Sequence, residues 1–168
     1  MRWAVAAYIE FFRDTPLLIQ MFFFFFGLPM LGVKLTPFTA AALSIALQHI
    51  AFFAEIYRGG LQAVSERHRE AAKAIGLPYW KTQILVVLPL AIVRVLPALA
   101  NQTVQIVKDT SVASTIAVAE LTLRGRTLAE ETAATSVAFV AVACYYLVIN
   151  GAITVVLRLV ERRLRFAE

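Results

Sequence analysis

Charged residues are scarce in this chain of 168 residues. Asp, Glu, Lys and Arg make up 16% of it, whereas they form about a quarter of a typical soluble domain. Hydrophobic residues reach 60%. This balance excludes an ordinary soluble domain and predicts a single integral membrane domain. The net charge of +5 does not indicate nucleic-acid binding, because the basic residues lie at the ends of apolar runs and form no soluble basic face.

Cysteine and histidine are nearly absent. Cys144 is the single cysteine, which excludes an internal disulfide, and its apolar surroundings suggest a buried, inert thiol. His49 and His68 lie too far from other ligand types to indicate a metal site. The chain also lacks a glycine-rich phosphate-binding loop that ends in Lys-Ser or Lys-Thr. We therefore expect no ATP hydrolysis by this chain and no cofactor.

Four apolar segments have about the 20 residues, or more, that a membrane-spanning helix needs. They predict an all-α integral membrane bundle with four spans, at about residues 16–33, 37–57, 91–121 and 135–157. Residues 1–14 are amphipathic and are expected on the cytoplasmic surface, whereas residues 121–134 are expected to form a polar external loop. In the second span, Gln48 and His49 are interpreted mainly as residues that form packing hydrogen bonds between helices.

A polar insert over residues 58–89 separates the second and third spans. Ser65 can cap a helix that runs to residue 75, Gly76 can leave this helix with a positive φ, and Pro78 prevents its continuation. Such a helix could dock onto a soluble partner. The pattern fits equally well a helix that lies on the lipid headgroups and is held there by its cations.

The insert resembles the EAA signature of the permease subunits of bacterial ABC importers. The signature reads EAA, three residues, Gly, nine residues, Ile, one residue, Leu-Pro, and this chain has Val86 in place of the Ile. The segments EFFRDTPLLIQMFFFFFGLP, AEIYRGGL, NQTVQIVKDTSVAS and AELT resemble blocks of the polar amino-acid branch of that family. The resemblance therefore covers nearly the whole chain. The matching insert residues, which by resemblance couple the permease to an ATPase, are Glu70, Ala71, Ala72, Gly76, Leu88 and Pro89.

The resemblance implies one type I permease domain over residues 1–168, in the bacterial inner membrane, that translocates polar amino acids. It also implies three kinds of partner: a second permease subunit, identical or related, a pair of cytoplasmic ABC ATPases, and an extracytoplasmic amino-acid-binding protein. Permeases of this branch typically have five spans, and the first of these has no counterpart in this sequence. A truncated reading frame or a shortened subunit would account for this difference.

The third span contains more polar residues than hydrocarbon tolerates, which predicts a broken helix that lines a cavity. Lys108 and Asp109 point in different directions on a helix, so we do not expect them to pair only with each other. They could receive the carboxylate and ammonium groups of an amino acid, or they could pin the helix to its neighbours. The predicted substrate-pathway residues are Asn101, Gln105, Lys108, Asp109, Thr110 and Ser111.

Basic residues predict the orientation in the membrane. Eleven fall on the side of the insert and the C-terminal tail: Arg2, Arg13, Arg58, Arg67, Arg69, Lys73, Lys81, Arg158, Arg162, Arg163 and Arg165. Only three, Lys34, Arg124 and Arg126, fall on the other side. By the positive-inside rule the C-terminus is cytoplasmic. Two alternatives to an importer subunit remain open: a passive pore or structural membrane subunit without an ATPase, and a truncated, non-functional fragment.

Overall fold

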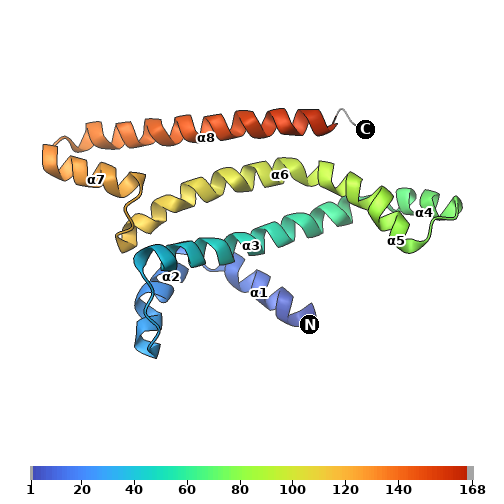
Figure 1. Ribbon diagram of the computed structural model, residues 1–168, viewed down its shortest axis with the longest axis horizontal. Helices are drawn as coiled ribbons and strands as arrows, with labels where there is room; N and C mark the ends of the chain where they lie inside the picture. Colours follow the sequence, from blue (N-terminus) through green and yellow to red (C-terminus); the bar gives the residue numbers. More distant parts are fainter. Residues whose placement is uncertain (1, 166–168) are drawn as a thin grey trace.

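The computed structural model describes residues 2–165, in which all regular secondary structure is helical (Figure 1). This confirms the predicted all-α class. The central helix is α3 (Pro37–Ala63), which contacts α1 (Arg2–Asp14) and α6 (Leu88–Asp109). Beyond α6 the chain turns back through α7 (Leu121–Thr132).

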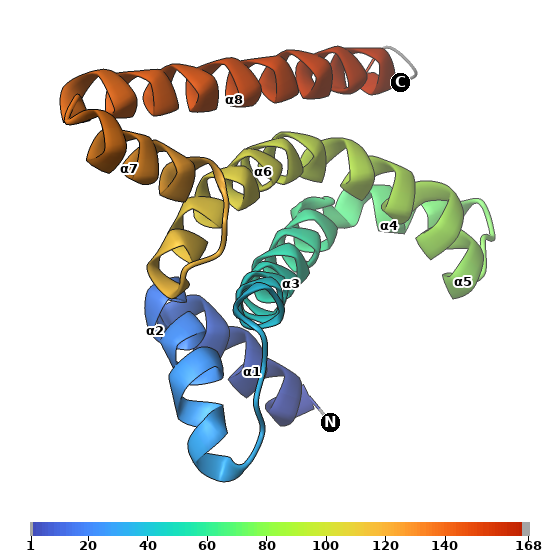
Figure 2. The same cartoon turned by 60° about the vertical axis from the view of Figure 1, so that its left-hand side comes forward.

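The last helix, α8 (Thr135–Arg165), runs back along α6 and contacts both α6 and α7 (Figures 1 and 2). The short helices α4 (Glu66–Ala74) and α5 (Tyr79–Thr82) lie at one end of the molecule, together with the end of α8. Helix α7 lies at the opposite end (Figure 1). The chain is therefore an elongated set of long helices with a short helical insert at one end.

Three helical units are long and apolar enough to cross a membrane: Pro37–Ala63, Tyr79–Ile116 and Thr135–Arg163. Their 27, 38 and 29 residues exceed the roughly 20 that a bilayer requires. They correspond in order to the second, third and fourth predicted spans. The first and the last extend beyond the C-terminal bounds expected from the sequence, whereas the middle one both begins and ends earlier than expected.

The second span does not end at about residue 57, as the sequence predicted, but continues through Gly59 and Gly60. Both glycines remain within α3, which continues to Ala63. Gly60 is buried against α6, and a Cβ added there would lie 2.0 Å from Val95 Cγ1. The glycine therefore allows α3 and α6 to approach closely instead of ending the helix.

The sequence predicted a surface segment over residues 1–14 and a span over residues 16–33, and the structure has a sharp bend between these two segments. Helix α1 is followed by α2 (Leu17–Phe22), a π-helical turn η1 (Phe23–Gly27) and a 3₁₀ turn η2 (Leu28–Leu31). The two halves meet at an angle of 103°. The bend occurs at Pro16, whose ring and missing N–H prevent α1 from continuing. Residues 2–31 can form a span only as this bent pair.

The third span is not broken at its polar residues. The helix continues from Tyr79 through a π-helical turn η3 (Gln83–Val87) and α6, and only Thr110–Ile116 (η4) tightens into a 3₁₀ helix. Residues 79–89, which the sequence assigned to the insert, therefore belong to the same helical unit as the third span. Three polar side chains of α6, those of Gln102, Gln105 and Asp109, have side-chain partners, and the backbone is not interrupted there.

The predicted external loop is a helix, α7. Glu120 caps its beginning: the carboxylate accepts hydrogen bonds from the backbone N–H groups of Thr122 (2.8 Å) and Leu123 (2.7 Å). Ala133 ends α7 in the left-handed conformation. Gly125 permits close contact with α8, because an added Cβ would lie 2.2 Å from Val142 Cγ2. The polar composition of this segment therefore reflects an exposed face of a helix.

Two small clusters of buried residues hold the helices together. One joins α2, the start of α3 and η4, and consists of Leu17, Met21, Ala40, Ala41, Ala113 and Ile116. The other lies beside the insert and consists of Val64, Val87 and Ala91. Small buried side chains of this kind allow close helix packing, as is typical of membrane helices.

Candidate functional site

The insert contains a short helix, α4, which follows the long helix α3 and precedes the long helix α6 in the chain. Glu70 and Ala71 are exposed, whereas Ala72 is buried. Gly76 has a φ of 79°, as its position after the helix predicted. The N–H of Gly76 donates to Lys73 O (2.9 Å) and that of Leu77 to Ala72 O (3.0 Å), the pattern of a Schellman motif.

The start of α4 differs from the expectation in detail. Ser65 precedes the helix, but its side chain accepts no hydrogen bond from the backbone. Its hydroxyl instead lies 2.8 Å from His68 Nδ1. His68 occupies the position of the acidic or amide residue in a capping box, and here the two side chains satisfy each other.

Exposed apolar side chains surround the end of α4. Ile75 is 77% exposed, Tyr79 65% and Trp80 74%. Leu88 and Pro89 are also exposed, at the first turn of α6. The insert therefore offers an apolar patch (Ile75, Tyr79, Trp80) next to the cationic side chains of α4, which suits a protein partner.

Asp109 belongs to a side-chain network between α3 and α6. Its Oδ2 lies 3.1 Å from His49 Nε2, and its Oδ1 accepts a hydrogen bond from Gln105 Nε2 (2.8 Å). Gln102 Nε2 donates to His49 Nδ1 (2.7 Å). Since Nδ1 accepts, Nε2 carries the hydrogen and donates to the carboxylate. Both oxygen atoms of Asp109 are therefore occupied.

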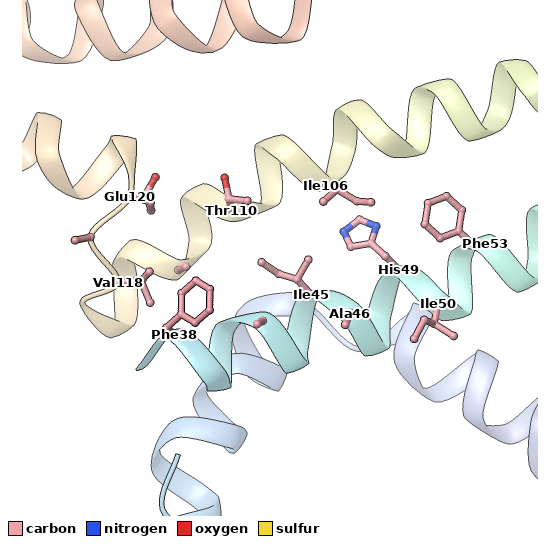
Figure 3. Close-up of a pocket in the computed structure, with 13 residues that line it drawn as sticks. Phe38, Ile45, Ala46, His49, Ile50, Phe53, Ile106, Thr110, Val118 and Glu120 are labelled. Carbon is pink, nitrogen blue, oxygen red and sulfur yellow. The ribbon is translucent and has the colours of Figure 1, made fainter. Parts of the chain in front are cut away.

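A cavity of about 560 Å³ opens beside this network, between α3 and the end of α6 (Figure 3). The His49 ring points from α3 toward α6, and Thr110 and Glu120 lie on the far wall (Figure 3). Most of the remaining lining is apolar, for example Phe38 and Ile106. The cavity thus combines a hydrophobic wall with a few polar groups, the usual composition of a small-molecule site.

The six predicted pathway residues do not converge on one point. Gln105 and Asp109 take part in the network with α3, and Thr110 lines the cavity. Asn101 and Lys108 instead line cavities between α6 and α8. The hydroxyls of Thr110 and Ser111 donate to the carbonyls of Val107 and Lys108, at 2.7 Å each. Lys108 and Asp109 therefore face opposite neighbours, as their adjacency on a helix predicted.

A second polar cluster connects α1 to the C-terminal half of α3. Glu55 accepts hydrogen bonds from Arg58 and lies 3.7 Å from Arg13 Nη1. At the bend after α1, Gln20 Nε2 donates to the carbonyls of Phe12 (3.0 Å) and Thr15 (2.9 Å). The first of these bonds satisfies the Phe12 carbonyl, which has no helical partner because Pro16, four residues later, lacks an N–H.

The comparison with protein families decides the class of protein. Residues 1–166 match the family model of the binding-protein-dependent transport system inner membrane component. The chain belongs to this family. As a member it is a multi-pass inner membrane component of an ABC importer, and ATP hydrolysis in such systems takes place in a separate ATPase. Family members work with such ATPases and with substrate-binding proteins.

Several named relatives are similar to this inner membrane component. The chain is 40% identical to the glutamine transport system permease protein GlnP of Escherichia coli, over 94% of this chain and 73% of that protein. A probable amino-acid ABC transporter permease, y4tG of Sinorhizobium fredii, is 39% identical over 95% of this chain and 69% of that protein. The L-cystine transport system permease protein TcyB of Bacillus subtilis is 34% identical, over 98% of this chain and 70% of that protein.

A solved structure has the same fold. The crystal structure of an amino acid ABC transporter with histidines superposes with a TM-score of 0.88 and 34% identity, over 94% of this chain and 74% of that chain. These matches confirm the ABC permease family that the sequence motifs indicated. They also confirm the type I permease-like bundle as the fold.

His49 forms hydrogen bonds between helices, as the sequence analysis expected. Gln102 and Glu120, which contribute to the network and the cavity, were not predicted as site residues. The signal that could have found Gln102 is the presence of polar side chains in the apolar parts of two neighbouring spans, since such side chains form hydrogen bonds with each other in a membrane. Nothing in the sequence pairs Glu120 with Tyr146, whose hydroxyl donates to it at 3.0 Å.

Proposed function

We propose that this chain is the permease subunit of an ATP-driven importer that carries polar amino acids across the inner membrane. Its similarity to permeases named for glutamine, cystine and amino acids supports this substrate class. The observation that carries the ATP-driven part of the proposal is the insert. It is a helix closed at its C-terminal end by a Schellman motif, with an exposed apolar patch, set between two membrane-spanning helices.

The insert transmits the movement of the ATPase to the spans. Val64, at the end of α3, and Val87, in η3, flank the insert and belong to one buried cluster. The N–H of Leu77 closes the turn after α4. A force on α4 therefore reaches the ends of α3 and α6 together. Closure of two ATPases on ATP would pull the inserts of two permease subunits toward each other and tilt their spans. The residues proposed to couple are Glu70, Ala71, Ala72, Gly76, Leu88 and Pro89.

The substrate passes close to the polar face of α6. We place the ammonium group of the amino acid near Asp109, whose carboxylate is held between His49 and Gln105. The neighbouring cavity offers room and an apolar wall for the rest of the molecule. Because both carboxylate oxygens already accept hydrogen bonds, the arriving cation replaces one of these donors.

The partners and the orientation follow from the same proposal. A second permease subunit, identical or related, completes the pathway, two ATPases bind the inserts, and an extracytoplasmic amino-acid-binding protein delivers the substrate. The basic residues concentrated on the insert and on the end of α8 place both in the cytoplasm. The C-terminus is then cytoplasmic.

The test is ATP-driven uptake by the assembled complex in proteoliposomes, with L-glutamine as substrate. Gly76→Trp should abolish uptake, because a bulky residue at a φ of 79° disturbs the turn after α4. Gly32→Trp is the matched control, since Gly32 has a φ of 86°, is equally open, and lies after η2, outside the insert. The control should retain uptake.

Two results would contradict the proposal. Normal ATP-coupled uptake by Gly76→Trp would remove the coupling role of the insert. Uptake that continues after ATP depletion would instead favour a passive pore.

A further inference from the structure

The insert is joined to α3 by a link of two residues. Val64 (φ −71°, ψ 119°) and Ser65 (φ −63°, ψ 146°) are both extended, so the helical backbone of α3 ends before α4 begins. Val64 is buried in one cluster with Val87, which fixes the position of the link. The backbone of the link does not fix the direction of α4, because rotation about its dihedral angles breaks no helical hydrogen bond.

Arg69 extends from α4 back across this link. Its Nη2 donates a hydrogen bond to the carbonyl of Leu61 (3.2 Å), in the last turn of α3. Its Nε lies 3.7 Å from Glu66 Oε2, in the first turn of α4. The Arg69 side chain is 29% exposed, and its Nε is buried. The guanidinium group is therefore directed mainly toward the end of α3.

The C-terminal end of α3 favours this contact. The last four carbonyls of a helix have no helical donor, and this end of the helix carries a partial negative charge. Leu61 is one of the last four residues of α3. A guanidinium group at this place supplies the missing donor in a charge-assisted hydrogen bond. Arg69 thus caps the end of α3 with a side chain that belongs to the insert.

Arg67, on the same helix, has a different environment. It is exposed, whereas Arg69 is half-buried. Two residues along an α-helix are separated by about 200° around its axis. The two arginines therefore extend from opposite sides of α4, Arg67 toward solution and Arg69 toward α3. The charge of Arg69 is used within the permease, and that of Arg67 is available to a partner.

We propose that Arg69 is a positioning residue that braces α4 against the C-terminal end of α3. With the brace, movement of the insert tilts α3. Without it, closure of the ATPases turns α4 about the link, and ATP is hydrolysed while α3 stays in place. The proposal rests on the proposed function and adds to it, since Arg69 is not among the six residues to which coupling was assigned. Loss of Arg69 should therefore separate ATP hydrolysis from uptake.

The number of ATP molecules hydrolysed per L-glutamine taken up measures this separation. Both rates are determined in the same proteoliposomes, at equal amounts of assembled complex. Arg69→Gln should raise the ratio roughly tenfold or more, the factor by which loss of a charge-assisted hydrogen bond shifts an equilibrium. Arg69→Lys keeps a charged donor and should stay within about threefold of the unmodified complex. Arg67→Gln is the matched control and should leave the ratio unchanged.

A covalent brace separates the position of α4 from the charge of Arg69. Leu61→Cys and Arg69→Cys are combined in a Cys144→Ala background, which removes the single native cysteine. A flexible bifunctional thiosulfonate, as long as an arginine side chain, then joins the two thiols. The free double-cysteine variant should show the raised ratio, and the cross-link should return it to within about threefold of Cys144→Ala. Each single-cysteine variant, treated with the same reagent, is the control. Complete cross-linking without recovery would overturn the proposal.

Hydrogen exchange reports the brace without transport. In the assembled complex without nucleotide, Arg69→Gln should speed exchange of the backbone amides of residues 64–70 by roughly threefold or more. Arg67→Gln should not. An unchanged exchange rate, or an unchanged ratio of ATP to glutamine, in Arg69→Gln would overturn the proposal. Absence of ATP-driven glutamine uptake by the unmodified complex would instead count against the proposed function, while exchange would still show whether Arg69 holds α4.

Discussion

At the scale of single residues, the hydrogen bonds of Asp109 allow its role in packing to be tested separately from the role of its negative charge. Asparagine has nearly the same shape, and its amide can donate to His49 if the imidazole hydrogen moves to Nδ1 and the Gln102 amide turns round. The hydrogen-bond network can therefore persist without a negative charge, with donors and acceptors exchanged along the line from residue 109 through His49 to Gln102. Leucine at this position would leave His49 Nε2, which is buried, and Gln105 Nε2 without their partner.

We predict that Asp109→Asn impairs uptake while the fold and ATPase docking survive. Loss of the carboxylate removes the proposed partner of the substrate ammonium group, so the apparent affinity or the turnover of glutamine uptake should change. Asp109→Leu should in addition destabilise the protein by about 1–3 kcal/mol, the cost of leaving buried polar groups unsatisfied. Thermal unfolding in detergent and uptake in proteoliposomes measure the two effects.

The exposed Asp14→Asn is the control and should alter neither quantity. If the uptake profile of Asp109→Asn equals that of the unmodified protein, Asp109 serves only to pack α6 against α3.

At the scale of secondary-structure elements, close approach between helices depends on glycine. Gly60 lies where α3 meets α6 and Gly125 where α7 meets α8, and in both places an added Cβ would overlap a valine methyl group. The insert joins the same two helices that meet at Gly60. The spacing of α3 and α6 therefore affects both the coupling and the hydrogen bonds of Asp109.

We predict that Gly60→Ala destabilises the protein by about 1–3 kcal/mol, as overpacking in a filled interior does. Val95→Ala should recover part of this loss, because it removes the methyl group at 2.0 Å and leaves Ala91 O at 3.3 Å and the Cβ of residue 95 at 3.5 Å. The matched control is Gly59→Ala, since nothing lies within 4 Å of the Cβ that it adds. Thermal unfolding of the three variants and the double variant in detergent gives the comparison.

Gly59→Ala should be neutral or slightly stabilising, since alanine favours a helix over glycine by about 1 kcal/mol. Equal effects of the two glycine substitutions would show that the contact between Gly60 and Val95 does not limit the packing.

At the scale of the whole molecule, the arrangement of the helices determines which segments share a side of the membrane. The insert and the end of α8 lie at one end of the long helices, and α7 lies at the other (Figure 1). Two crossings, Tyr79–Ile116 and Thr135–Arg163, separate the insert from the C-terminal end. These two segments must therefore lie on the same side, whichever side it is.

We predict that this side is the cytoplasm. Green fluorescent protein fused after residue 168 should fluoresce, and alkaline phosphatase fused there should be inactive. Alkaline phosphatase inserted at the turn between α7 and α8 should be active. Trypsin should cut at Arg67 in inside-out vesicles. It should not cut there in right-side-out vesicles whose membranes are intact. Opposite results at residue 168 and in the insert would contradict the crossing pattern itself.

The sequence by itself determined the class, the family and the approximate order of the spans. Hydrophobic composition selects a membrane protein because the bilayer requires long apolar helices, and the turn after α4 could be predicted because Gly76 is suited to a positive φ. The local signals for Pro16 and Gly60 were also visible, but their consequences were not. One causes a bend of 103°, and the other allows a close contact within a continuous helix.

Only the tertiary structure decided which polar residues meet. Asp109 and Lys108 are adjacent in the sequence, yet one pairs with His49 on α3 and the other faces α8. Pairing across helices depends on how each helix is rotated about its axis. Packing against neighbouring helices fixes this rotation, and the periodicity of one segment does not reveal it.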